Sequence, residues 1–141
     1  MTAYALANLS PQPVAHDEVL TYIERIQPTM DPFGGRFLVH GAPEREVREG
    51  AWPQALVLIS FPSMDHARRW YDSAAYQELI PLRARHIPGD ILLIDGVGPG
   101  YDPAKTAALM RAAAEAATTE SATTTEAESA AGSAARSGGA A

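Results

Sequence analysis

With 141 residues, of which 46% are hydrophobic and 20% charged, the chain has the size and apolar content of one folded domain. It contains no cysteine, which excludes disulfides, thiolate catalysis and iron–sulfur clusters and makes the reducing cytoplasm the expected location. The net charge is −6 without a basic region, and no apolar run approaches the roughly 20 residues of a membrane span, so we expect neither a nucleic acid nor a membrane as partner.

The first third of the chain predicts a strand, a helix and a second strand. Ala3–Leu9 is short and apolar and is followed by prolines, which is typical of a strand that ends there. Residues 14–30 carry apolar side chains at helical spacing. Two glycines at 34–35 allow a chain reversal into a strand at residues 36–41. Strict alternation in this strand would place Arg36 and His40 together on one face.

The middle of the chain predicts a buried strand, a broken helix and a last strand. Ala55–Phe61 is almost unbroken in its apolar character. Ser63 is a good N-cap for a helix that reaches residue 72, and Ser73 is expected to cap a second helical piece. In that piece, Tyr76 and Arg83 share one face with two aliphatic residues. A last apolar strand is expected at residues 90–95.

The composition changes at Tyr101. Pro103 suits the first position of a helix, and residues 101–117 are expected to form a short helix or a linker. Residues 118–141 are rich in Ala, Thr, Ser and Glu and contain no aromatic or branched aliphatic residue. Such a segment buries too little surface to offset its ordering entropy, so we predict a disordered tail behind a domain of residues 1–100.

The order βαββαβ predicts an α+β fold, a ferredoxin-like sandwich with a four-stranded antiparallel sheet and two helices on one face. The strands at 55–61 and 90–95 are apolar on both faces, and such strands are covered on both sides. We therefore expect a homodimer in which two sheets close face to face into a dimeric α+β barrel. The alternative is a cover provided by residues 109–117 of the same chain.

Four stretches together resemble a known family: GGRFLVHG at 34–41, ALVLISF at 55–61, FPSMDHARRWYDSAAYQELIPLR at 61–83 and GDILLIDG at 89–96. They are similar to the bacterial family labelled domain of unknown function 1330, over residues 3–97. The resemblance implies the dimeric α+β barrel superfamily. That superfamily includes cofactor-free monooxygenases acting on aromatic polyketides, small-ring isomerases and haem-binding enzymes. His40 departs from the pattern, since a basic residue such as arginine is expected there.

Arg36 and His40 are the first candidate site residues. Arg36 would anchor an anionic or enolic small molecule, and His40 would act as an acid or base near neutral pH. The other interpretation pairs Arg36 with Asp31 or Glu78 and leaves His40 in solvent at the strand end.

Trp70, Tyr71 and Tyr76 cluster around the helix break and form the second candidate group. Large aromatic side chains with polar tips can line a pocket for a flat ligand, and Arg83 is added as a substrate-binding candidate. Tyr71 and Tyr76 are also candidate proton carriers. The alternative interpretation makes the aromatic residues part of the core.

The histidines show no spacing typical of a metal site. His16, His40, His66 and His86 are scattered, without a His-x-His or His-x-x-x-His pattern, and none stands out as a haem ligand. We therefore expect neither a metal nor another cofactor.

Two functions fit these patterns. The first is a dimer that binds a small apolar or mildly acidic metabolite. The second is a cofactor-independent monooxygenase or isomerase acting on an enolisable or aromatic small molecule. No pair of residues has a compelling acid–base arrangement, which favours the first.

Overall fold

The computed structural model describes residues 1–10, 12–41 and 44–137, and for residues 122–137 it describes the backbone alone. The chain divides into two units, Met1–Pro99 and Gly100–Ala141.

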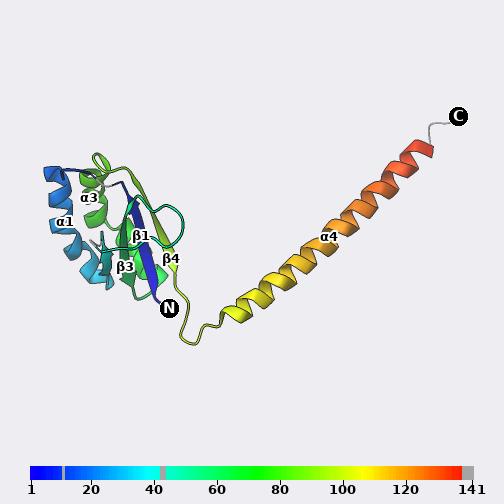
Figure 1. Ribbon diagram of the computed structural model, residues 1–141, viewed down its shortest axis with the longest axis horizontal. Helices are drawn as coiled ribbons and strands as arrows, with labels where there is room; N and C mark the ends of the chain where they lie inside the picture. The colour runs from blue at the N-terminus through cyan, green and yellow to red at the C-terminus, as the bar shows by residue number, and fades with distance from the viewer. Residues whose placement is uncertain (11, 42–43, 138–141) are drawn as a thin grey trace. The chain divides into compact units, whose positions relative to one another are not determined.

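The first unit contains one sheet of four antiparallel strands (Figure 1). The strands are β1 (Ala3–Leu9), β2 (Arg36–His40), β3 (Ala55–Phe61) and β4 (Gly89–Asp95). Their spatial order is β2-β3-β1-β4, so the first strand lies between the third and the fourth. This is the predicted ferredoxin-like α+β arrangement, and the prediction is confirmed.

The helices of this unit lie on one side of the sheet, as α1 and α3 show in Figure 1. They are α1 (Asp17–Met30), the 3-10 turn η1 (Asp31–Phe33), α2 (Met64–Asp72) and α3 (Ala74–Ala84). Each α-helix begins at a side chain that accepts a backbone hydrogen bond: His16 Nδ1 for α1, Ser63 Oγ for α2 and Ser73 Oγ for α3. The predicted caps at Ser63 and Ser73 are confirmed.

The core lies between the helices and one face of the sheet. Trp70, Tyr76, Phe61 and Met30 are the largest fully buried side chains. Trp70 Nε1 donates a hydrogen bond of 3.1 Å to Thr29 Oγ1, which joins α2 to α1. The predicted core alternative for Trp70 and Tyr76 is therefore correct, although both side chains also border the cavity described below.

A β-bulge in β2 overturns the predicted alternation of that strand. Phe37 lies opposite Ile59 and Val39 lies opposite Leu58, so Leu38 is an extra residue between them. As a result His40 pairs with Val57 on the helix-facing side, where its ring stacks on Phe37 with 4.6 Å between centroids.

Arg36 lies ahead of the bulge and pairs with Ser60 on the other side of the sheet. The prediction that Arg36 and His40 share a face is therefore wrong. A strand with one added residue changes faces at that residue, and strict alternation does not hold across it.

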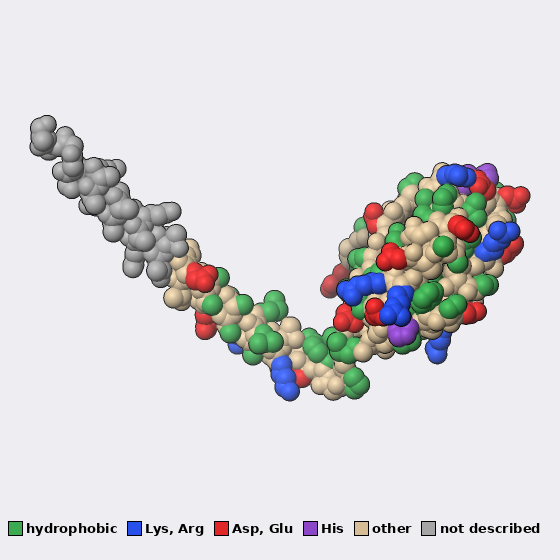
Figure 2. Space-filling view, turned by 180° about the vertical axis from the view of Figure 1, so that it is seen from behind, with side chains coloured by type: hydrophobic (Ala, Val, Ile, Leu, Met, Phe, Trp, Pro, Cys, Tyr) green, Lys and Arg blue, Asp and Glu red, His purple; other side chains and the backbone are tan. Residues whose placement is uncertain are grey.

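The outer face of the sheet, which points away from the helices, is mostly apolar. Its aliphatic and aromatic side chains are Tyr4, Leu6, Val39, Leu56, Leu58, Leu92 and Ile94. Leu92 and Ile94 are 48% and 50% exposed. Over the face of the molecule that Figure 2 shows, acidic and basic side chains of this unit are mixed, and neither sign gathers into one patch there.

The second unit contains α4 (Pro103–Ser137). The helix continues past residue 117, whereas the sequence predicts a disordered tail from residue 118. Alanine is the best helix former, and repeated alanines explain why the backbone stays helical without branched apolar residues. Residues 138–141 of the predicted tail lie outside the described residues. Among the residues that the structure describes, no helix combines the length and the apolar character needed to cross a membrane.

Candidate functional site

A cavity of about 80 Å³ lies between the helix-facing side of the sheet and the helices α1 and α3. Ala5 and Ala7 of the central strand β1 form part of its floor. Because alanine fills little volume, these two positions leave space that larger strand residues would occupy. Most of the remaining wall is apolar, with Val57 and Ile59 from β3 and Ile91 from β4.

Besides Trp70, whose indole N–H is hydrogen bonded to Thr29, four side chains with polar atoms line this apolar cavity. They are Tyr22 from α1, His40 from the end of β2, and Tyr76 and Arg83 from α3. Tyr76 and Arg83 lie on one face of α3, as the sequence predicts from their helical spacing. His40 reaches the cavity only because of the bulge in β2.

Tyr22 and Tyr76 form a buried pair. Their hydroxyl oxygens are 2.8 Å apart and hydrogen bonded. Burial raises the pKa of Tyr76 well above its usual range, and the charge and the hydrogen bond of Tyr22 raise it further. Tyr76 therefore stays protonated at neutral pH. It can donate a hydrogen bond to a ligand, but it is a poor base there.

Arg83 is a buried cation. It is 7% exposed, and its Cζ lies 5.5 Å from the centre of the Tyr22 ring. Its charge and a hydrogen bond lower the pKa of Tyr76, although less than burial raises it. Among the described residues, none pairs with Arg83 in a salt bridge and none accepts a hydrogen bond from its Nε.

A buried guanidinium with an unpartnered N–H is costly unless an anion or another acceptor meets it. The chemistry of the cavity is therefore that of an anion site with apolar walls: one fixed positive charge, two phenol hydroxyls and one imidazole at the side.

The structure brings together some predicted site residues and separates others. His40, Trp70, Tyr76 and Arg83 all line the cavity. Arg36 does not, because it is exposed on the outer face of the sheet. Tyr71 also does not line it, although its ring lies 5.5 Å from that of Tyr76.

Tyr22 is a residue of the site that the sequence did not indicate. Its helical spacing identifies it only as part of the buried side of α1. Its hydroxyl belongs to the site because it is hydrogen bonded to the hydroxyl of Tyr76, which is 54 residues away along the chain. No local pattern contains that pairing.

The model of a domain of unknown function (DUF1330) matches residues 2–97, and the chain belongs to this family, which confirms the resemblance seen in the sequence. No curated protein matches the chain. Among solved structures, the protein Rv0793 from Mycobacterium tuberculosis is 12% identical with a TM-score of 0.50, and the match covers 72% of this chain and 100% of that one.

Two further solved structures are similar at lower scores. SnoaB, described as a cofactor-independent oxygenase from Streptomyces nogalater, is 12% identical with a TM-score of 0.48, covering 72% of this chain and 98% of its own. A dimeric ferredoxin-like protein of unknown function from Jannaschia sp. CCS1 is 14% identical with a TM-score of 0.45, covering 65% and 98%. At such identities the likeness concerns the fold alone.

Proposed function

We propose that this DUF1330 protein binds a small, mildly acidic and otherwise apolar metabolite in the cavity beside Arg83, and that it does so as a homodimer. The observation that carries the proposal is the guanidinium of Arg83, buried in an apolar wall with its Nε unpartnered among the described residues. A carboxylate or enolate held there would offset the cost of the buried charge.

The size of the cavity limits the ligand. An engineered apolar cavity of roughly 150 Å³ holds benzene, and this cavity is about 80 Å³. Butyrate has six non-hydrogen atoms, as benzene has, so a short-chain monocarboxylate of this size is near the upper limit and a fused aromatic ring system is too large. The phenol hydroxyl of Tyr76 is protonated and is well suited to donate a second hydrogen bond to the carboxylate.

The outer face of the sheet supports the homodimer. Leu92 and Ile94 are about half exposed beside other aliphatic side chains of the same face. Contiguous apolar surface of this kind is typical of an interface between protein chains. A second copy placed face to face would cover it, in keeping with the barrel that the sequence predicts. The cytoplasmic location stays a prediction.

One observation favours a second function, that of a cofactor-independent monooxygenase or isomerase. His40 lines the same cavity as Arg83, so a group that can move a proton at neutral pH shares the site with an anion anchor. In this alternative, Arg83 and not Arg36 would hold the enolate, and His40 would take the proton.

The test of ligand binding compares two arginine variants. Butyrate is titrated into the full chain and followed by NMR, with 1-butanol as the uncharged control ligand. Arg83→Met is expected to weaken butyrate binding by about tenfold or more, because it removes the charge but keeps an apolar side chain of similar length. Arg36→Met is the matched control and is expected to bind butyrate like the unchanged chain. Equal affinities in the two variants would contradict the proposed site.

Oxygen consumption with small enolisable acids separates the two functions. If His40→Ala abolishes turnover while butyrate still binds, the enzymatic alternative is supported. If no such acid is turned over and butyrate binds through Arg83, the binding function is supported.

A further inference from the structure

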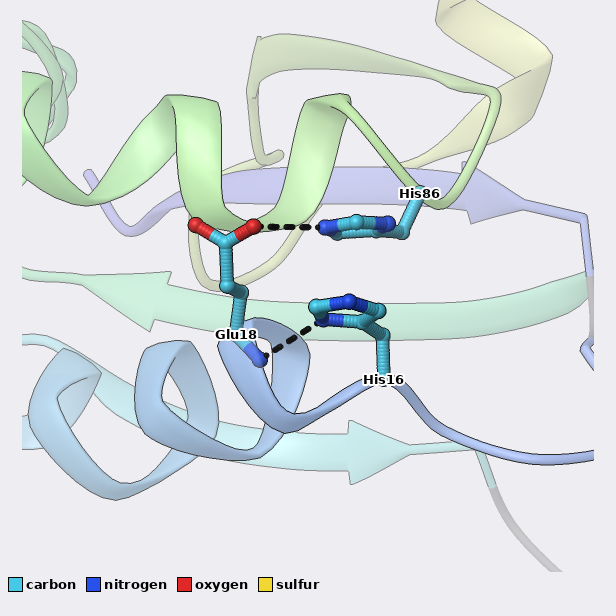
Figure 3. Close-up of side chains that lie close together, drawn as sticks. All are labelled: His16, Glu18 and His86. Atoms are coloured by element: carbon cyan, nitrogen blue, oxygen red, sulfur yellow. Dashed lines mark hydrogen bonds and ion pairs between the residues drawn. The ribbon is translucent and has the colours of Figure 1, made fainter.

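A second polar cluster lies near the cavity, where the start of α1 meets the segment that follows α3 (Figure 3). It consists of His16, Glu18 and His86, and one potential ligand atom of each lies within 4.8 Å of the others. His86 Nε2 is 2.9 Å from Glu18 Oε1, and His16 Nδ1 accepts a hydrogen bond of 3.0 Å from the backbone N–H of Glu18. The two imidazole rings stack with 3.7 Å between their centroids.

The fold fixes two of the three side chains in place. Glu18 lies in the first turn of α1. His86 follows the end of α3, where its backbone N–H donates to the carbonyl of Arg83. A carboxylate and an imidazole are thus held against each other by backbone geometry, and His16 lies beside them on an exposed helix start.

We infer that His16, Glu18 and His86 form a binding site for a first-row divalent metal ion, with Zn²⁺ as the ion that best suits two imidazoles and one carboxylate. Zinc lies about 2.0–2.2 Å from nitrogen and oxygen ligands, so the ligand atoms around a tetrahedral ion are about 3.3 Å apart. The Glu18 and His86 atoms are already close to that separation. Three protein ligands leave one coordination position for water or another small ligand.

His16 has to turn for the site to close. Stacked rings hold their lone pairs in parallel planes, so both cannot point at one ion. His16 is the exposed member of the pair and can rotate, at the expense of its stacking on His86 and its capping hydrogen bond to the Glu18 amide. Metal binding by this cluster therefore predicts a change in the environment of the Glu18 backbone amide.

Arg85 competes with a metal ion for the carboxylate of Glu18. Its Nη1 lies 3.1 Å from Glu18 Oε2 and occupies the second carboxylate oxygen. The competing interpretation is that Glu18, Arg85 and His86 are simply an ion-pair network. The two interpretations make opposite predictions for Arg85→Gln. If the cluster is a metal site, removing the neighbouring cation raises its affinity for the ion. If it is only an ion-pair network, the chain binds no metal ion there, with or without Arg85.

The ion would tie together two walls of the cavity. Val19 follows Glu18, Ile87 follows His86, and both line the cavity. A bound ion therefore joins the start of α1 to the segment between α3 and β4. Binding an ion to the folded state alone raises the temperature of unfolding.

The test is a titration of the full chain, first freed of metal by a chelator, with Zn²⁺ in a calorimeter and with Co²⁺ by visible absorption. We expect one ion per chain at roughly micromolar affinity. His86→Ala, His16→Ala and Glu18→Gln should each weaken binding by about tenfold or more. Arg85→Gln should strengthen it. His66→Ala is the control, because this exposed histidine on α2 contacts Ser63 and lies outside the cluster.

Two further measurements distinguish loss of metal binding from loss of folding. Circular dichroism shows that each variant is folded before it is titrated, and NMR follows the Glu18 amide as Zn²⁺ is added to the unchanged chain. The inference is overturned if the unchanged chain binds no Zn²⁺ at millimolar concentration, or if His66→Ala weakens binding as much as His86→Ala does.

Discussion

The two faces of the sheet are both mostly apolar, yet they differ in what covers them. On the helix-facing side, Ile59 and Phe61 are 4% and 1% exposed beneath helices of the same chain. On the outer side, Leu92 and Ile94 are about half exposed. The inner face is thus completed by its own chain and determines the fold, whereas the outer face is the surface on which a second chain is proposed to pack. The layer between this inner face and the helices also contains a buried cation, Arg83 of α3, beside an apolar cavity.

The largest loss of stability is expected from a substitution in the core, between the inner face and the helices. Trp70→Ala removes a fully buried side chain that packs on Phe61 and Tyr76 and donates a hydrogen bond to Thr29. The free energy of unfolding should fall by about 3–5 kcal/mol, measured by urea unfolding followed by circular dichroism. Trp52→Ala is the control, because Trp52 is 57% exposed, and it should change the free energy by less than about 1 kcal/mol. Similar losses in both variants would contradict the description of the core.

The next effect is expected on the outer face. Leu92→Glu combined with Ile94→Glu places carboxylates on the proposed dimer surface, where each occurs twice by symmetry. The chain should stay folded while the dimer dissociation constant rises by roughly thirtyfold or more, corresponding to about 2 kcal/mol. Analytical ultracentrifugation measures this change.

Leu109→Glu is the control for the dimer experiment. It tests the alternative in which residues 109–117 cover the outer face, and it should leave the dimer unchanged. A chain that is monomeric before any substitution would remove the face-to-face dimer.

The same contrast explains what could be predicted from the sequence. The strand and helix order follows from patterns within single elements, and so do the caps at Ser63 and Ser73. The apolar character of the outer face could also be predicted, because most side chains of β3 and β4 are apolar on both faces of these strands. Local patterns of this kind carry most of the information needed for a ferredoxin-like fold.

The site was predicted only in part, because its geometry depends on contacts between distant elements. A β-bulge has no reliable signature in RFLVH, so the sequence predicts Arg36 and His40 on one face of β2, whereas they lie on opposite faces. The Tyr22–Tyr76 pair and the Glu18–His86 pair join residues that are 54 and 68 positions apart. Histidine spacing along the sequence does not indicate that His86 meets Glu18, so the sequence predicts no metal site at the place where we propose one.

A smaller effect, of opposite sign, is expected from Arg83, the buried cation of α3. Arg83→Met replaces a buried cation that lacks a salt bridge to any described residue with an apolar side chain of similar length. The free energy of unfolding should rise by roughly 1–2 kcal/mol, because the desolvation cost of the charge disappears. Arg69→Met is the control on an exposed helix face, where the ion pair with Asp65 contributes little. A clear loss of stability in Arg83→Met would show that Arg83 stabilises the fold and is not kept for a ligand.

The smallest effect at neutral pH is expected from the tyrosine pair. Tyr76→Phe removes the hydrogen bond to the buried Tyr22 hydroxyl and should lower the free energy of unfolding by about 1 kcal/mol near pH 7. Its pH dependence is the sharper test. The pKa of Tyr76 is raised in the folded state, chiefly by burial, so the unfolded chain loses this proton first as the pH rises. That difference favours unfolding above about pH 10, the ordinary pKa of tyrosine.

The unchanged chain should therefore lose stability between about pH 9 and pH 11 faster than Tyr76→Phe does, so that the gap between the two narrows and then reverses. Urea unfolding at several pH values measures both slopes. Tyr101→Phe is the control, since Tyr101 is exposed and lies in the other unit, and it should keep the slope of the unchanged chain. If Tyr76→Phe also kept that slope, Tyr76 would titrate in the folded protein as it does in the unfolded chain. The cavity would then have to be open to water, and the burial of Arg83 would no longer be an argument for an anionic ligand.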